Sequence, residues 1–270
     1  MDAIFDTDKH VLIEKPMCTT LEDCRRVAAG ADQHPGVVQV GLEYRYMPQI
    51  AHFLSELPCV GEIKTLFIRE HRHPFLPKVG NWNRFTRNTG GTLVEKCCHF
   101  FDLMNWITQE RPSRVYASGG QDVNHLGERY DGEVPDILDN AFVIVDYEGG
   151  VRALLDLCMF AEAARNEQEI TAVGDRGLVE CFIPSGELAI GNRETRALET
   201  RHVPVAEEIL KAGFHHGATY YEHRAFLDAV RGKGSVCVDA SAGALAVAVG
   251  LAAQRSIQER RPVEMSELGF

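Results

Sequence analysis

The sequence predicts an α/β protein that begins with a short parallel βαβ unit and continues into a larger α+β part built on a mostly antiparallel sheet. Two observations predict this. Residues 10–46 alternate a buried strand, an amphipathic helix and a second buried strand, the pattern of a parallel sheet. Residues 114–205 hold several short strands with brief connections, such as 147–150, which indicate antiparallel hairpins.

The first strand, in "HVLIEKP" at 10–16, ends on a pair of charges. The apolar run 11–13 suits a strand that is covered on both faces, and Pro16 cannot continue a hydrogen-bonded ladder. Glu14 and Lys15 therefore stand at the carboxyl end of the strand. Ligands bind at this edge in open α/β sheets, so we expect a cation to be presented there.

A helix and a second strand complete the first unit. The helix is expected over 19–31, because Thr19 and Glu22 have capping-box spacing and an apolar stripe follows them. Residues 36–46 are typical of the next buried strand, and residues 48–57 of a short amphipathic helix that opens on a proline.

The second part follows in turn. Residues 62–73 begin it with a strand, and a Gly- and Asn-rich loop at 78–91 precedes a helix at 92–107. Helices at 218–231 and 240–258 close the chain; the uncharged run at the start of the last helix is too short for a membrane span and predicts a buried helix. Further strands are expected at 114–120, 140–150, 151–160, 168–174, 177–184, 187–191 and 197–205.

Composition excludes several classes of partner. The chain has 28 Lys plus Arg against 39 Asp plus Glu, for a formal charge of -11, and the charges are interspersed. This argues against nucleic acid and anionic membranes as partners. The eight cysteines form no C-x-x-C pair, and no signal-peptide pattern opens the chain. We therefore expect reduced thiols and a cytoplasmic protein.

The helix expected at 92–107 brings an acid and a base together. Thr92 and Glu95 again have capping-box spacing, and Glu95 and His99, four residues apart, share one face near the helix N-terminus. The two glycines at 90–91 allow close approach of a ligand or strand. The pair is a candidate acid–base site, although a Glu/His pair at this spacing is more often a surface contact.

The motifs that carry a resemblance are, in chain order, Glu14-Lys15-Pro16, "VGLEYRYMP", "GEIKTL", "GGTLVEKCCHFFDLMNWI", "DNAFVIVDYEGGVRA" and "RRPV". Together they resemble the glucose-fructose oxidoreductase, inositol dehydrogenase and MocA (Gfo/Idh/MocA) family of nicotinamide-dependent oxidoreductases. The resemblance implies that residues 1–46 are the last part of a Rossmann dinucleotide-binding domain. It implies that residues 47–270 are an α/β domain that holds the substrate and joins copies of the chain through its sheet into a homo-oligomer.

The resemblance also implies roles for residues at matching positions. Lys15 would contact the substrate hydroxyl and the nicotinamide, after a proline that is commonly cis in the family. His99 would be the catalytic base, since an imidazole titrates near neutral pH. Glu95 stands where the family has an aspartate and would hold the imidazole tautomer. The candidate cofactor-binding residues for NAD or NADP are Glu14, Lys15, Pro16 and Arg45.

Further residues are candidates for the substrate pocket. Trp82 and Arg84, in the loop before the glycine pair, are expected to wall a pocket for a polyol, which presents an apolar ring face and hydroxyls. His215 and His216, with Tyr220, form a second candidate patch, although adjacent histidines before a helix more often face solvent. The complete candidate set for substrate binding is Lys15, Trp82, Arg84, His99, His216 and Tyr220.

Two further interpretations, a catalytic role for Arg45 or Asp102 and a metal site, have less support from the sequence. Arg45 and Asp102 are each more typical of a structural partner than of a catalytic group. No metal site is expected, because Cys97, Cys98 and His99 are consecutive and point in different directions on a helix.

The family's first strand, its G-x-G-x-x-G turn and the helix after that turn have no counterpart in this sequence. Two functions therefore stay open. One is hydride transfer between NAD or NADP and a secondary hydroxyl of a sugar, inositol or related polyol, by a chain that lacks part of the Rossmann domain. The other is a non-catalytic module for binding or dimerisation. Retention of Lys15, Glu95 and His99 favours the enzyme, because a module without catalysis has no physical need for that set.

Overall fold

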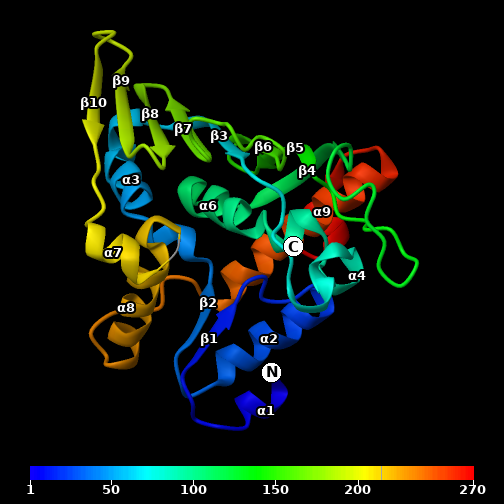
Figure 1. Cartoon of the computed structure of the whole chain (residues 1–270). Helices are drawn as coiled ribbons and strands as arrows, with labels where there is room; N and C mark the ends of the chain where they lie inside the picture. The colour runs from blue at the N-terminus through cyan, green and yellow to red at the C-terminus, as the bar shows by residue number, and fades with distance from the viewer. Residues whose placement is uncertain (214) are drawn as a thin grey trace.

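The structure is a computed structural model and describes residues 1–213 and 215–270. Within these residues the strands form a two-stranded sheet and a nine-stranded sheet, with helices between and beside them (Figure 1). The predicted combination of a small parallel sheet and a large, mostly antiparallel sheet is confirmed.

The small sheet is formed by β1 (Val11–Glu14) and β2 (Val38–Gly41), which pair in parallel. The crossover helix α2 (Leu21–Gln33) joins the two strands, and a short helix α1 (Asp2–Phe5) precedes them. Every residue of β2 is buried, as its apolar sequence predicts for an inner strand.

Two boundaries near the small sheet differ from the prediction. The N-cap of α2 is Thr20, one residue after the predicted Thr19; its side-chain oxygen accepts a hydrogen bond from a backbone N–H of the first turn. The strand predicted over 36–46 stops at Gly41, because β1 ends opposite it and offers no further ladder partner. The chain then forms the 3-10 helix η1 (Glu43–Tyr46).

The large sheet has the strand order β10-β9-β8-β7-β3-β6-β5-β4-β11, and its neighbours are antiparallel except β3 and β6. The predicted strands are present, most of them with trimmed ends; β4 and β9 extend one or two residues beyond the predicted bounds, and β11 adds an unpredicted edge. The strands are β3 (Ile63–His71), β4 (Pro112–Gly120), β5 (Asn140–Tyr147), β6 (Arg152–Cys158), β7 (Gln168–Gly174), β8 (Gly177–Ile183), β9 (Glu187–Asn192), β10 (Leu198–His202) and β11 (Val263–Glu264).

Helices cover one face of the large sheet. Figure 1 shows α3 (Pro48–Val60), α6 (Cys98–Thr108) and α9 (Ala240–Glu259) on the same side of it. Burial alternates along β5, where Phe142 and Ile144 on the other side are 58% and 42% exposed. The outer face of the sheet is therefore open in the described part of the chain.

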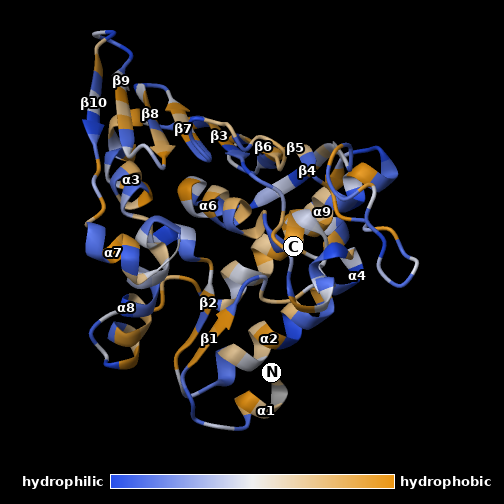
Figure 2. Ribbon diagram, in the orientation of Figure 1, coloured by the Kyte–Doolittle hydropathy of each residue, from blue (hydrophilic) through white to orange (hydrophobic). Residues whose placement is uncertain are grey.

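The helix α9 lies between the two sheets and packs against α2, α6 and β4. Figure 2 shows hydrophobic residues along α6 and α9 and on β1. By length and composition alone α9 could cross a membrane, but 61% of its apolar window is buried inside the protein. The predicted buried helix is confirmed, and it forms the centre of the core.

The helix predicted over 92–107 is interrupted. The chain forms α5 (Thr92–Glu95), turns, and resumes as α6. Thr92 does not cap a helix, because its hydroxyl donates to the carbonyl of Leu138 (2.6 Å) and Gly91 takes the N-cap position. The remaining elements are α4 (Thr86–Thr89), α7 (Glu207–Ala212), α8 (Ala218–Val230), η2 (Val79–Arg84), η3 (His215–Gly217) and η4 (Met265–Leu268).

Candidate active site

The carboxyl end of β1 presents Lys15, as predicted. The peptide bond between Lys15 and Pro16 is cis, as the resemblance implied. Lys15 Nζ donates a hydrogen bond to the backbone carbonyl of Glu95 (3.0 Å) and lies 3.9 Å from the Glu95 carboxylate. The lysine side chain is 22% exposed. An ammonium group has three donors, so Lys15 keeps the capacity to contact a ligand.

His99 lies in the first turn of α6, four residues after the Glu95 that contacts this lysine. It is 2% exposed, and its imidazole stacks on the Tyr44 ring with centroids 4.2 Å apart and an interplanar angle of 12°. Its Nδ1 has no hydrogen-bond partner among the described residues. Burial holds the pKa of His99 well below its usual value, and the charges of Lys15 and Lys96 act in the same direction. His99 is therefore a neutral imidazole that can accept a proton.

Glu95 does not take the predicted role of orienting His99. The turn between α5 and α6 breaks the helical spacing on which that prediction depended. The Glu95 carboxylate lies beside Lys15, and no hydrogen bond joins it to His99 in the described part of the chain. In this structure Glu95 positions Lys15 instead.

The glycine pair is needed for close approach to a helix. Gly90 and Gly91 have φ values of 77° and 85°, in the left-handed region that favours glycine. A Cβ on Gly91 would lie 2.6 Å from the side-chain amide nitrogen of Gln254. That amide, from α9, donates a hydrogen bond to the Gly90 carbonyl. The glycines thus set α5 against α9.

A buried ion pair holds the tyrosine on which His99 stacks. Lys96, in the turn between α5 and α6, places its Nζ 2.8 Å from the Glu70 carboxylate on β3. The same Nζ donates a hydrogen bond to the Tyr44 hydroxyl (2.8 Å), and Glu70 also accepts from Gln168 (2.7 Å). The ring that stacks on His99 is therefore held by charges that are fully buried and paired with each other.

Arg45 is fully engaged in the fold. Its guanidinium donates two hydrogen bonds to the Asp102 carboxylate (2.7 and 2.6 Å) and one to the Cys237 carbonyl (2.7 Å). It also lies 4.7 Å from the centroid of the Trp106 ring. Arg45 is therefore a structural partner of Asp102 in this structure, and its assignment to the cofactor-binding set stays a prediction.

Trp82 and Arg84 do not join the Lys15 site. Arg84 is buried and donates to the Glu128 carboxylate (3.0 Å), in the connection between β4 and β5. Trp82 lies half-exposed on η2. In the described part of the chain no hydrogen bond or ion pair links either side chain to Lys15 or His99. The prediction that they wall the substrate pocket is not supported.

The histidine patch is divided by the structure. His215 comes to the site, where its ring centroid lies 6.2 Å from that of Tyr44. His216 is half-buried, and burial lowers its pKa. Tyr220 packs edge-on against Tyr221 and beneath Arg224 on α8. The structure thus places His215 beside Tyr44, and the charge of Glu70, the partner of Lys96, acts on His216.

Sequence reasoning missed four residues that shape the site. Lys96 carried a usable signal, since it is a charge within the apolar run "LVEKCCHFF". Glu43 carried another, because it follows the second parallel strand as Lys15 follows the first. Tyr44 and Glu70 gave no signal, because their roles depend on contacts with segments that are distant in sequence.

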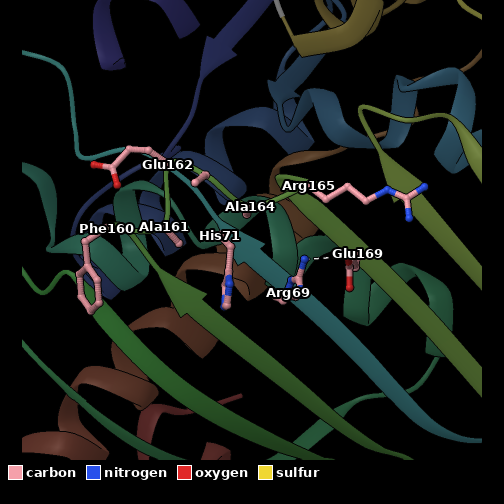
Figure 3. Close-up of a pocket in the computed structure, with 9 residues that line it drawn as sticks. Arg69, His71, Phe160, Ala161, Glu162, Ala164, Arg165 and Glu169 are labelled. Atoms are coloured by element: carbon pink, nitrogen blue, oxygen red, sulfur yellow. Dashed lines mark hydrogen bonds and ion pairs between the residues drawn. The ribbon is translucent and has the colours of Figure 1, made fainter.

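A pocket lies on the open face of the large sheet, apart from the predicted site residues. Figure 3 shows Arg69 and His71 of β3 and Glu169 of β7 lining it. Arg69 donates to Glu169 (2.6 Å), and His71 Nε2 lies 3.1 Å from Asp156. Arg69 and Glu169 thus pair within the pocket, and the pocket holds none of the predicted site residues.

The residues present fit the reactive end of a nicotinamide dinucleotide. Lys15 offers a partly exposed ammonium, and the unpartnered Nδ1 of His99 is a buried polar atom without a protein partner. The connection at 15–20 has no glycine, and Thr20 caps α2, so this connection does not form a glycine-rich cradle for a pyrophosphate. No group of three or more His, Cys, Asp or Glu side chains that could hold a metal ion occurs in residues 1–213 and 215–270.

These features define a class of protein. A parallel strand presents a lysine at its carboxyl end, and a large sheet is covered by helices on one face, where one helix carries a buried histidine. Residues 59–265 match the family described as "Oxidoreductase family, C-terminal alpha/beta domain", and residues 1–42 match "Oxidoreductase family, NAD-binding Rossmann fold". The chain belongs to the Gfo/Idh/MocA oxidoreductase family.

Individual relatives agree with this assignment. The chain is 33% identical over 124 residues to a putative oxidoreductase, YteT, of Bacillus subtilis, covering 43% of this chain and 28% of that protein. It is 24% identical over 262 residues to myo-inositol 2-dehydrogenase of Thermotoga maritima, covering 96% and 74%. A solved levoglucosan dehydrogenase in complex with NADH and levoglucosan has the same fold, with a TM-score of 0.82, 16% identity and coverage of 97% and 75%.

The buried state of His99 predicts a pH-dependent stability. Its folded-state pKa is depressed, so its contribution is present above the unfolded pKa of about 6.5 and is lost as pH falls below that value. The free energy of unfolding should fall by up to about 1.4 kcal/mol per pH unit from this residue between pH 6.5 and 5. Urea unfolding of the wild type and His99→Phe, which keeps a ring on Tyr44, should show a steeper loss for the wild type. Identical slopes would contradict the buried neutral imidazole.

The two lysines of the site should differ in their effect on stability. Lys96→Met leaves the buried Glu70 carboxylate without its closest cation and should lower the free energy of unfolding by about 3 kcal/mol. Lys15→Met removes a partly exposed pair and should cost less than about 1 kcal/mol. Urea unfolding measures both, and Lys96→Met combined with Glu70→Met should recover much of the loss. Equal, small effects of the two single variants would rule out a structural ion pair.

Proposed function

We propose that this chain is a nicotinamide-dependent oxidoreductase that transfers a hydride between NAD or NADP and a secondary hydroxyl of a sugar, inositol or related polyol. The observation that carries the proposal is the placement of Lys15 at the carboxyl end of β1 beside the α5–α6 segment that holds the neutral His99. Family membership and the names of relatives that act on inositol and levoglucosan support the substrate class.

The chemistry assigns a task to each residue. Oxidation of an alcohol requires a base for the hydroxyl proton, and the nicotinamide, when bound, supplies the hydride acceptor. His99 receives the proton, because its imidazole is neutral and its Nδ1 has no hydrogen-bond partner among the described residues. Lys15 stabilises the charge that develops on the alkoxide oxygen, and Glu95 holds the Lys15 ammonium in place through its carbonyl and carboxylate.

The same proposal includes the roles of the two domains, the compartment and the classes of partner. Residues 1–46 act as the part of the Rossmann domain that faces the nicotinamide, and residues 47–270 act as the substrate domain. The eight cysteines are free thiols in the structure, which suits a cytoplasmic protein. The net charge of -11 disfavours nucleic acid and anionic membranes as partners.

Turnover tests these assignments. Purified chain is assayed by NAD(P)H absorbance with inositols and sugars, and Lys15→Met or His99→Asn should each lower kcat by about 10²-fold or more. Arg114→Gln, at an exposed residue on the open sheet face, serves as a control and should retain wild-type kcat. Turnover that survives both site changes would contradict the roles given to Lys15 and His99.

The open sheet face supports the second candidate function, association with another copy of this chain. Tyr116 and Ile144 are direct cross-strand neighbours there, and Phe142 lies two residues along the same strand. All three are exposed large hydrophobic residues on a face without a covering helix in the described ranges. A second copy would offer the same apolar surface in a two-fold arrangement.

Solution mass tests the association. Sedimentation or light scattering should find the wild-type chain as a dimer or higher oligomer, and Phe142→Glu should shift it toward the 30.0 kDa monomer, because the charge would be buried at the contact. Leu76→Glu, an exposed apolar position in a loop, is the matched control and should not change the mass. A monomeric wild type would overturn the proposed contact. An oligomer without nicotinamide binding or turnover would favour the non-catalytic module.

A further inference from the structure

A second carboxylate–histidine pair flanks the same tyrosine as His99. His215 Nδ1 lies 2.8 Å from Glu43 Oε1, and Glu43 Oε2 accepts a hydrogen bond from the Thr219 hydroxyl (2.6 Å). Glu43 is buried, so both its oxygens are committed to these partners. Burial raises the pKa of Glu43, but the hydrogen bonds from His215 and Thr219 outweigh it and hold the pKa below its usual value. The pair is therefore a carboxylate that fixes an imidazole.

The geometry leaves the other nitrogen of His215 available. With Nδ1 turned toward Glu43, Nε2 has no protein partner among the described residues. An imidazole held through Nδ1 by a buried carboxylate, with Nε2 free, is the arrangement that enzymes use for proton transfer. The His215 side chain is 45% exposed, whereas His99 is 2% exposed as a residue. His215 can therefore exchange protons with water, and His99 is shielded from it.

The backbone holds His215 in this place at a cost. His215 and His216 have φ values of 53° and 56°, which non-glycine residues rarely adopt. Such conformations persist only where the surroundings enforce them, and they cluster at functional sites. Here the enforcing contacts are those of Glu43, which follows β2 in η1, and of α8, which packs on η1. The carboxyl ends of β1 and β2 thus contribute Lys15 and the support of His215 to one region.

We propose that His215, oriented by Glu43, is a second proton-transfer group of this site, which carries the proton of the substrate hydroxyl from the buried His99 region to bulk water. This inference rests on the proposed function. In the oxidation, the carbon–hydrogen bond breaks and its electron pair leaves as hydride to the nicotinamide dinucleotide. The oxygen–hydrogen bond breaks, its proton is taken up by His99, and the proton reaches water by way of His215 Nε2, the solvent-accessible group beside the same tyrosine. One alcohol and one oxidised nicotinamide thus give one carbonyl, one reduced nicotinamide and one released proton.

Chemical rescue by imidazole tests the proposal. His215→Gly is the variant of choice, because glycine accepts the left-handed φ of this position and leaves space for a free imidazole. With the full chain, NAD(P) and a polyol substrate, kcat should fall by about 10²-fold and recover on addition of imidazole. Glu43→Gln, which keeps the shape but not the charge, should lower kcat without a response to imidazole. Circular dichroism at the assay temperature confirms that each variant is folded.

A matched control is available within the chain. His125 also has a left-handed φ (64°) and also places its Nδ1 2.8 Å from a carboxylate, that of Glu128, in the connection between β4 and β5. Its glycine variant, His125→Gly, should show no imidazole-dependent increase in kcat. Wild-type kcat in His215→Gly, or a loss that imidazole does not restore, would overturn the role of His215 alone. A wild-type chain without turnover would overturn the proposed function and this inference together.

Discussion

The buried ion pair between Lys96 and Glu70 is the interaction on which the rest of the site depends. It ties the turn between α5 and α6 to β3 of the large sheet, and through the Tyr44 hydroxyl it reaches η1 at the end of the small sheet. Charges without access to water must be paired, so this contact fixes three segments at once. The stacking of His99 on Tyr44 and the position of Glu95 beside Lys15 both follow from where that turn is held.

The site combines a buried histidine with a lysine and a second histidine that are partly exposed to solvent. His99 is kept neutral by burial and by surrounding cations. Lys15 follows β1 and is partly exposed, and His215, held by Glu43 after β2, is 45% exposed at its side chain. Each is held by a glutamate, Glu95 for the lysine and Glu43 for the histidine. In the proposed reaction His99 would take up the proton, Lys15 would donate to the substrate oxygen, and His215 would carry the proton to water.

The sequence predicted an element correctly where the residues of that element alone determine its structure, and failed where a contact with a distant segment does. The strand before Lys15 and the strand β5 were predicted correctly, because a run of apolar and β-branched residues and a following proline or turn are local signals. The continuous helix over 92–107 was wrong, because the charge of Lys96 is satisfied by Glu70, a partner from another element, and no helical pattern encodes that contact. The pairing of Arg45 with Asp102 could not be read from the sequence for the same reason, since Asp102 lies on a different helix.

The central claim is that His99 is a buried, neutral imidazole held by the network behind Tyr44. Nuclear magnetic resonance of the chain with nitrogen-15-labelled histidine tests it most directly, with His99→Phe used to assign the signal. At pH 6, below the usual histidine pKa of about 6.5, the account predicts nitrogen shifts of a neutral ring for His99. Shifts of a doubly protonated imidazolium at that pH would contradict the account.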